Sequence, residues 1–340
     1  MNRPTRWFHQ LQWLAEAAVA LPLIVLGAIL PEILLPSVAS LIGSCIYFLF
    51  GDARRWSLLN LRIAFAGQRD GRQLQRLARA SFAHQVLLYC QTFRLTRRVI
   101  KQRLVIGGLE NVPTLRSRHR GVIAVIGHLG HFEYLSPALW RIGLPNLVVS
   151  RPLDNPYLRW LQNRCRRRIG TRFTGKDVNG IRNAMRHLKQ GGGIIIAIDL
   201  NTTQHPVFVN LFGIPAATPR GAADMALRIG CDVILLTAHR GQNGRHVVTI
   251  HPPFDLIQTG DHEADVAANT RQFTSALASQ LLRHPDQYFW QHPRYRFRPD
   301  GLIWTSKTSW QKIRDALQAQ QRIGHQNGRD PADSVRILRL

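Results

Sequence analysis

The sequence predicts an α/β protein with a mostly parallel central sheet, helices on both faces, and an N-terminal hydrophobic helical segment that anchors it to a membrane. From residue 121 onward, apolar β-branched runs of strand length alternate with stretches of helical periodicity. Residues 17–51 contain a single charged side chain, Glu32. With 45% hydrophobic residues among 340, the chain can bury a sizeable core, which excludes intrinsic disorder.

The apolar N-terminal region consists of two runs, 17–30 and 33–50, separated by Pro31 and Glu32. A helix that crosses a bilayer needs about 20 apolar residues, so each run is slightly short and the two together are too long for one span. The pattern favours one kinked helix or a re-entrant pair of short helices. The alternatives are a cleaved signal peptide, with a cleavage site near 37–40, and a buried helix pair in a soluble protein.

Beyond this region, strands and helices follow one another in a regular order. We predict strands at 121–126, 146–150, 193–198, 233–237 and 245–251. We predict helices at 71–92, 134–142, 156–168, 178–190, 219–229 and 264–283. Because alternating strands and helices form βαβ units, the sheet should be mostly parallel. The expected domains are a membrane anchor at 1–51, the α/β domain at 52–305 and a basic tail at 306–340.

The chain is strongly basic, with 45 Lys and Arg against 20 Asp and Glu and a net charge of +25. Arginine outnumbers lysine 40 to 5, and a guanidinium group suits phosphate and carboxylate partners. A GC-rich coding sequence would give the same bias. Charge alone leaves nucleic acid, an anionic membrane or an acidic protein or substrate as partners. The four cysteines have no CxxC spacing, which argues against a disulfide scaffold or a zinc ribbon and favours a reducing compartment.

Polar side chains follow three of the predicted strands. His128 and Glu133 come after the first strand, Arg151 after the second and Asp199 after the third. In open α/β sheets, ligands bind beyond the carboxyl ends of the strands. This edge of the sheet is therefore the predicted catalytic site.

His128 and Glu133 are five residues apart, so on a continuous helix their side chains would diverge. If His128 lies on the turn before the helix, and Gly130 allows a sharp bend, Glu133 can accept a hydrogen bond from one ring nitrogen. The other nitrogen is then free as a general base that deprotonates a hydroxyl for attack on an acyl group. The alternative is a solvated histidine and a glutamate that is favoured by the helix dipole.

His128 and His131 also have the HxxH spacing of metal ligands. No third ligand is evident, and His205 is the only nearby candidate. We therefore predict no metal site and no cofactor. His131 is then expected to be a pocket or packing residue.

Several blocks of the chain together resemble the late acyltransferases of lipid A biosynthesis, the lauroyl/myristoyl transferase family of Gram-negative bacteria. These enzymes belong to the bacterial lysophospholipid-acyltransferase-like superfamily. The blocks are IGHLGHFE at 126–133, SRPLDNPYLRWLQ at 150–162, FVNLFGIPAATPRGAADMAL at 208–227 and QYFWQHPRYRFRPDG at 287–301. They occur in order over roughly residues 5–302. His131 and Phe132 replace the Asn-Trp pair of the family's HLGNWE motif.

The resemblance implies transfer of a fatty acyl chain from acyl-acyl-carrier protein to a hydroxyl of a lipid A precursor or related glycolipid. The reaction would occur at the cytoplasmic face of the inner membrane, by direct attack and without a covalent enzyme intermediate. His128 would be the general base and Glu133 its orienting partner. Arg151 would bind a phosphate or position the donor. Asp199 matches the first acid of the family's Asp-x-Asp stretch, whose second acid is Asn201 here, and it is expected to bind the substrate.

The resemblance also accounts for the charge, because carrier proteins are acidic, lipid A precursors carry phosphates and the inner leaflet is anionic. We expect a basic cluster to bind the carrier protein or the headgroup; a solvated helix face is the alternative. The cluster consists of Arg164, Arg166, Arg167, Arg168, Arg172 and Lys176. Nucleic acid is not an expected partner, because no nucleic-acid-binding motif is found and the N-terminus is apolar. The sequence leaves open a different glycolipid or lysophospholipid as the acceptor, and it also leaves open a non-catalytic membrane scaffold.

Overall fold

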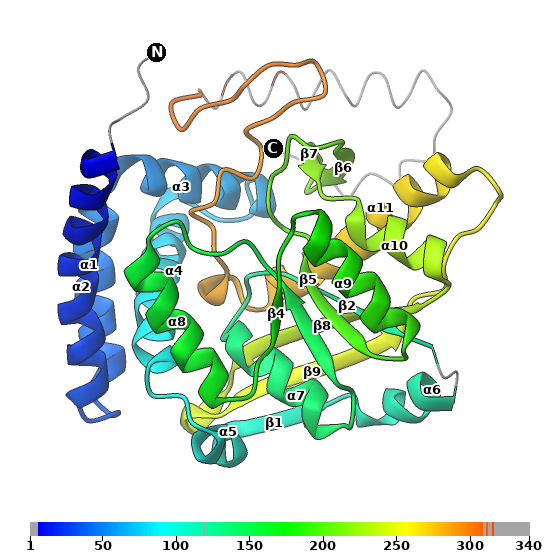
Figure 1. Cartoon of the computed structure of the whole chain (residues 1–340). Coiled ribbons are helices and arrows are strands. Elements are labelled where there is room, and N and C mark those ends of the chain that lie inside the picture. The colour runs from blue at the N-terminus through cyan, green and yellow to red at the C-terminus, as the bar shows by residue number, and fades with distance from the viewer. Residues whose placement is uncertain (1–5, 118–119, 309–310, 312–314, 316–340) are drawn as a thin grey trace.

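The computed structural model describes residues 6–117, 120–308, 311 and 315, and it has the predicted α/β fold. A seven-stranded sheet has the strand order β1-β9-β8-β2-β5-β3-β4 (Figure 1). All neighbouring strands pair in parallel except β8 and β9, which are antiparallel. The predicted tail at 306–340 lies almost entirely outside the described residues.

The strands of this sheet follow the apolar runs of the sequence. They are β1 (Leu104–Gly107), β2 (Val122–Ile126), β3 (Asn146–Val149), β4 (Phe173–Thr174), β5 (Gly193–Ala197), β8 (Asp232–Arg240) and β9 (His246–Pro253). The five predicted strands are all present. The short edge strands β1 and β4 were not predicted, nor was the separate antiparallel hairpin of β6 (Val207–Leu211) and β7 (Ile214–Thr218).

Helices cover both faces of the sheet, and β2 shows why. All five of its residues are buried, and they alternate between two hydrophobic clusters, with Ile123 and Val125 in one and Val122, Ala124 and Ile126 in the other. The first cluster contains residues of α4 (Gly71–Thr92), α9 (Val178–Lys189), α10 (Gly221–Ile229) and α11 (His262–Arg283). The second contains residues of α5 (Arg97–Arg103), α6 (Val112–Ser117) and α7 (Leu135–Arg141).

The N-terminal region forms three helices: α1 (Arg6–Ile29), α2 (Leu35–Leu49) and α3 (Gly51–Phe65). The break between α1 and α2 falls at Pro31 and Glu32, as the sequence suggests, and both helices contact α4. Arg103 pairs with Glu32, and Arg94 donates to the carbonyls of Gly27 and Leu30. These contacts tie the turn between α1 and α2 to the helices of the α/β domain.

The helix α2 packs closely on α4. A Cβ atom on Gly43 would lie 2.5 Å from backbone atoms of Ala83, so only glycine fits at this crossing. Among the described residues, no single helix combines the length and the apolar character needed to cross a bilayer. The pair α2 and α3 meets both conditions together but is bent by 100° at its junction. Membrane anchoring by residues 1–51 stays a prediction.

Candidate active site

The turn after β2 places His128 at the carboxyl edge of the sheet. Gly130 has a φ of +60°, and a Cβ atom there would lie 2.2 Å from the carbonyl oxygen of Ala238. The sharp bend predicted at this glycine is therefore present, and only glycine fits it. The backbone N–H of Gly130 donates to the carbonyl of Gln287 (3.0 Å), and that of Phe289 donates to the carbonyl of His128 (3.2 Å). The C-terminal block thus holds the turn in place.

Asp199 is the hydrogen-bond partner of His128. Its Oδ1 lies 2.9 Å from the ring Nδ1, and its Oδ2 accepts from the backbone N–H of His128 at 2.7 Å. The two residues meet because β2 and β5 are adjacent parallel strands, with Ile126 opposite Ala197. The Asp199 side chain is 4% exposed and that of His128 is 28% exposed. The ring nitrogen Nε2 has no hydrogen-bond partner among the described residues and is free to act on a ligand.

The electrostatics of this pair suit a general base. Burial lowers the pKa of His128, whereas the charge and the hydrogen bond of Asp199 raise it. Together the two effects of Asp199 outweigh burial, so the pKa of His128 is above its usual value. Burial raises the pKa of Asp199, but the interactions with His128 outweigh it and bring this pKa to about 2. Asp199 is therefore ionised at neutral pH. It holds the Nδ1 proton and can stabilise an imidazolium ion.

The predicted hydrogen bond between His128 and Glu133 is wrong. Glu133 lies in the 3₁₀ turn η2 (Phe132–Tyr134). Its partner is Arg166 on α8 (Pro156–Arg168), whose Nε donates to Oε1 of Glu133 at 2.8 Å. Nη2 of Arg166 also lies 2.8 Å from this oxygen. After the bend at Gly130, the Glu133 side chain is buried, and a buried carboxylate needs a cation close by. Arg166 supplies that cation, while Asp199 occupies Nδ1 of His128. The role of Glu133 in turnover stays a prediction.

His131 lies in the protein interior. It is 1% exposed, and its ring packs edge-on against Tyr134 and His246, with centroids 5.0 and 5.1 Å apart. Of the two roles left open by the sequence, the structure favours packing, because the side chain offers almost no surface to a substrate. In the described part of the chain, no group of three or more His, Cys, Asp or Glu residues is arranged to hold a metal ion.

Arg151 follows β3 at the same edge of the sheet as His128 and Asp199. The strand order places β5 between β2 and β3, so Arg151 is two strands away from His128. Its side chain is 75% exposed and pairs with Asp154 at 2.8 Å. The structure thus places Arg151 at the predicted edge without bringing it into contact with the histidine.

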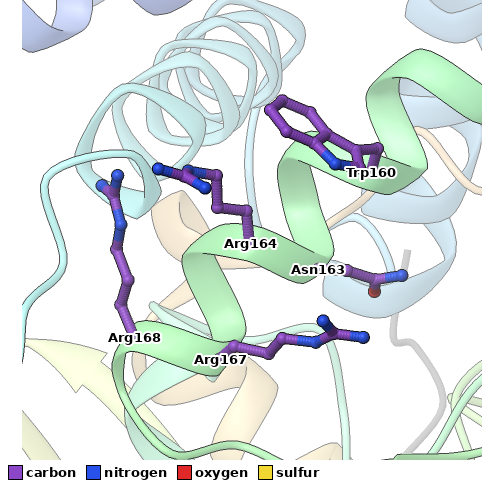
Figure 2. Close-up of a pocket in the computed structure, with 5 residues that line it drawn as sticks. All are labelled: Trp160, Asn163, Arg164, Arg167 and Arg168. Carbon is purple, nitrogen blue, oxygen red and sulfur yellow. The ribbon is translucent and has the colours of Figure 1, made fainter.

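The part of the predicted basic cluster that lies on α8 divides between two sides of this helix. Arg166 faces inward to Glu133, whereas Arg164 and Arg167 line a cavity of about 490 Å³ (Figure 2). The cavity is also lined by Trp160, Asn163 and Arg168. Arg164 and Arg167 are therefore neighbours, as expected, but they lie on the side of the helix away from the Glu133 pair.

The structure adds supporting residues to which the sequence assigned no role. His292 accepts at Nε2 from the backbone N–H of Asn201 (2.8 Å), two residues after Asp199. Asn60 on α3 donates to the carbonyls of Trp290 (2.7 Å) and His292 (2.8 Å). The C-terminal block QYFWQHPRYRFRPDG was the available signal for His292, and the stretch NLRIAF at 60–65, which also fits the family resemblance, was the signal for Asn60. Together these contacts fix the chain behind Asp199.

Comparisons with known proteins show to which family the chain belongs. Residues 3–297 match the family described as bacterial lipid A biosynthesis acyltransferase. The chain is similar to the lipid A biosynthesis lauroyltransferase of Escherichia coli K12, with 29% identity over 61% of this chain and 66% of the relative. It is also similar to the palmitoleoyltransferase of the same organism, with 25% identity over 57% of this chain and 62% of the relative.

A lipid A biosynthesis acyltransferase of Haemophilus influenzae is 29% identical over 56% of this chain and 61% of its own length. The matched region thus covers about two thirds or less of each relative. The family match, by contrast, extends over nearly the whole chain. This protein belongs to the bacterial lipid A biosynthesis acyltransferase family.

Proposed function

We propose that this protein transfers a fatty acyl chain from acyl-acyl-carrier protein to a hydroxyl of a lipid A precursor or a related glycolipid. The observation that carries the proposal is the His128–Asp199 pair at the carboxyl edge of the sheet. The His128 side chain is partly exposed, and its Nε2 has no hydrogen-bond partner among the described residues. Family membership supports the substrate class, since the relatives are named as lipid A lauroyl- and palmitoleoyltransferases.

In the proposed reaction, Nε2 of His128 takes the proton of the acceptor hydroxyl as its oxygen attacks the thioester carbonyl carbon. The new C–O bond forms, the C–S bond breaks, and the proton passes from His128 to the departing thiolate. Asp199 stays ionised and stabilises the transient imidazolium. The acceptor attacks the donor directly, so no bond to the enzyme is needed.

Other residues would support this step without touching the proton. Glu133 and Arg166 join the turn after His128 to α8, and we expect them to keep the imidazole in position. Arg151 is a cation at the same edge and is proposed to bind a phosphate of the acceptor or to position the donor. Arg164 and Arg167 are proposed to bind a further anionic group on α8.

The proposed location is the inner membrane, with the catalytic domain on the cytoplasmic side. It is supported by large apolar side chains that are exposed on α1, α2 and their junctions. These are Leu11, Leu14, Leu21, Val25, Ile29, Ile33, Leu34, Leu41, Phe48, Leu49 and Phe50. Exposed apolar surface of this extent is typical of protein or membrane contacts.

The decisive experiment incubates the purified full-length protein with acyl-acyl-carrier protein and a lipid A precursor in mixed micelles. Mass spectrometry should show a product heavier by one acyl group. His128→Ala should lower the rate by a factor of about 100 or more while the protein stays folded. Near-normal turnover by this variant would refute the base assignment, and acylation of a lysophospholipid instead of the precursor would change the acceptor.

A further inference from the structure

A basic pocket lies on α8, outside the His128 site. Its lining residues are Trp160, Asn163, Arg164, Arg167 and Arg168, which are spaced i, i+3, i+4, i+7 and i+8 and therefore share one side of the helix (Figure 2). The cavity measures about 490 Å³. All three arginines are exposed, and none forms an ion pair with a carboxylate in the described part of the chain.

Trp160, at the N-terminal end of the pocket, is exposed like the three arginines. Trp160 is 63% exposed, and the guanidinium of Arg164 lies 5.7 Å from the centre of its ring. Tyr157, one turn earlier on α8, is exposed as well, and so is Leu153, just before the helix. The start of α8 and the three arginines of the pocket thus form an aromatic and aliphatic surface that ends in a cluster of positive charge.

Direct hydrogen bonds join this surface to the apolar helix α1. Asn155, which caps α8, donates through Nδ2 to the carbonyl of Trp13 (2.9 Å) and to Glu16 (3.0 Å). Leu11 and Leu14, on the same part of α1, are exposed. The start of α8, which leads into the basic pocket, therefore lies beside the helix that carries exposed aliphatic side chains.

We propose that the α8 pocket binds the phosphate group of an anionic phospholipid at the surface of a bilayer. Arginine binds phosphate oxygens through a planar fork of N–H donors, and Trp and Tyr prefer the interface between headgroups and acyl chains. The exposed aliphatic side chains of α1 would lie among the acyl chains. An acidic protein would also suit the arginines, but it gives no reason for the aliphatic and aromatic surface beside them.

The helix that carries the pocket is also connected to the active site through an ion pair. Arg166, on the opposite side of the same helix, holds Glu133 in the turn that follows His128. A phospholipid bound to α8 would therefore orient the carboxyl edge of the sheet relative to the membrane. This inference rests on the proposed membrane location, but it does not depend on the acyl transfer step itself.

The test measures flotation of the full-length protein with vesicles of phosphatidylcholine, with or without phosphatidylglycerol. The triple variant Arg164→Gln/Arg167→Gln/Arg168→Gln should bind phosphatidylglycerol vesicles about tenfold more weakly or worse. A matched control, Arg182→Gln/Arg186→Gln/Lys189→Gln on α9, removes the same charge from another exposed surface and should change binding less than about twofold. Trp160→Ala should weaken binding to both kinds of vesicle.

Several results would overturn the proposal. One is a triple variant that binds phosphatidylglycerol vesicles as the unaltered protein does. Another is an equal loss in the α9 control, which would show that only net charge matters. A triple variant that keeps vesicle binding but loses affinity for acidic carrier protein would identify a protein-docking site instead. Salt should weaken vesicle binding of the unaltered protein more than that of the triple variant, and equal sensitivity would count against the pocket.

The two proposals can fail separately. Vesicle flotation needs no acyl donor, and His128→Ala should bind vesicles as the unaltered protein does. If transfer is absent while flotation behaves as expected, only the proposed function fails. If transfer occurs while the arginine variants float normally, only the phospholipid site fails.

Discussion

Asp199 acts on His128 at two atoms, because one oxygen binds the ring and the other binds the backbone N–H. A carboxylate bound in this way fixes both the rotamer and the tautomer of the imidazole. It also raises the pKa of His128 against the effect of burial. The rate and the pH dependence of the reaction should therefore both depend on Asp199.

Asp199→Asn should lower kcat by a factor of about 100 to 10,000, since the imidazolium loses its counter-charge. His128 must be neutral to act as a base, so activity rises as pH increases through its pKa. Because Asp199 raises that pKa, the variant should move the acidic limb of the kcat/KM profile to lower pH. Glu110→Gln, an exposed charge removal on η1 (Leu109–Asn111), is the control and should leave the limb in place. An unshifted limb in Asp199→Asn would contradict the assignment.

Glu133 and Arg166 form a buried ion pair, with side chains 5% and 12% exposed. Removing one member leaves the other charge without compensation, which costs about 3–5 kcal/mol in buried pairs. Glu133→Gln and Arg166→Gln should each lower the free energy of unfolding and the turnover, and the double variant should be no worse than either single one. Urea unfolding and kcat for the four proteins measure this coupling.

Unequal effects of the two single variants on turnover would contradict this expectation. If Arg166→Gln keeps normal turnover while Glu133→Gln loses it, Glu133 acts on the reaction independently of Arg166. The positioning role proposed for the pair would then be wrong.

The β6–β7 hairpin is attached to the domain by the C-terminal block. Buried Arg294 donates to the carbonyl of Ala217 and to Oγ1 of Thr218, both at 2.6 Å, and Arg298 donates to the carbonyl of Pro215 at 2.6 Å. Tyr295 donates to the carbonyl of Leu211 at 2.9 Å. Arg294 and Arg298, both in the C-terminal block at 287–301, therefore hold the hairpin in place.

Arg294→Ala should lower the free energy of unfolding by about 2–4 kcal/mol, because it leaves two buried acceptors without donors. Urea unfolding measures this loss. Arg296→Ala is the control from the same block, because its side chain is exposed, and it should cost less than about 1 kcal/mol. A loss for Arg294→Ala as small as that of the control would show that the two hydrogen bonds contribute little.

Three elements of the molecule meet at a cluster of buried histidines: His84 on α4, His131 after β2 and His246 on β9. Burial lowers the pKa of His84 to about 4 and that of His246 to about 3, and it also lowers the pKa of His131 well below its usual value. Each group binds a proton more readily in the unfolded chain. Their contribution to stability is therefore complete above pH 6.5 and declines as pH falls below it.

At pH 5, each strongly shifted histidine should cost about 2 kcal/mol relative to pH 7, since one pKa unit corresponds to about 1.4 kcal/mol. Urea unfolding at the two pH values should show this loss in the unaltered protein. His246→Phe, which keeps an aromatic ring beside Tyr134, should reduce the loss by about that amount. His205→Gln, at an exposed position, should not change it. An equal loss in His246→Phe would contradict the explanation.

Five of the seven strands of the main sheet, and the edge of the sheet where the site lies, follow from the sequence alone. Buried parallel strands need continuous apolar runs, so the predicted strand 121–126 became β2 at Val122–Ile126. The parallel order then placed His128 and Asp199 at one edge, because carboxyl ends of neighbouring strands coincide there. These inferences depend only on which short stretches of the sequence are apolar, because such stretches are the ones that become buried.

The pairing of the side chains was decided by the tertiary structure. His128 binds a carboxylate 71 positions away, and Arg166 binds Glu133 across 33 positions. Local periodicity does not encode such partners, because they depend on strand register, on the bend at Gly130 and on how α8 packs. For the same reason, the sequence grouped the arginines of α8 as one cluster, whereas the fold turned Arg166 inward and left the others at the surface.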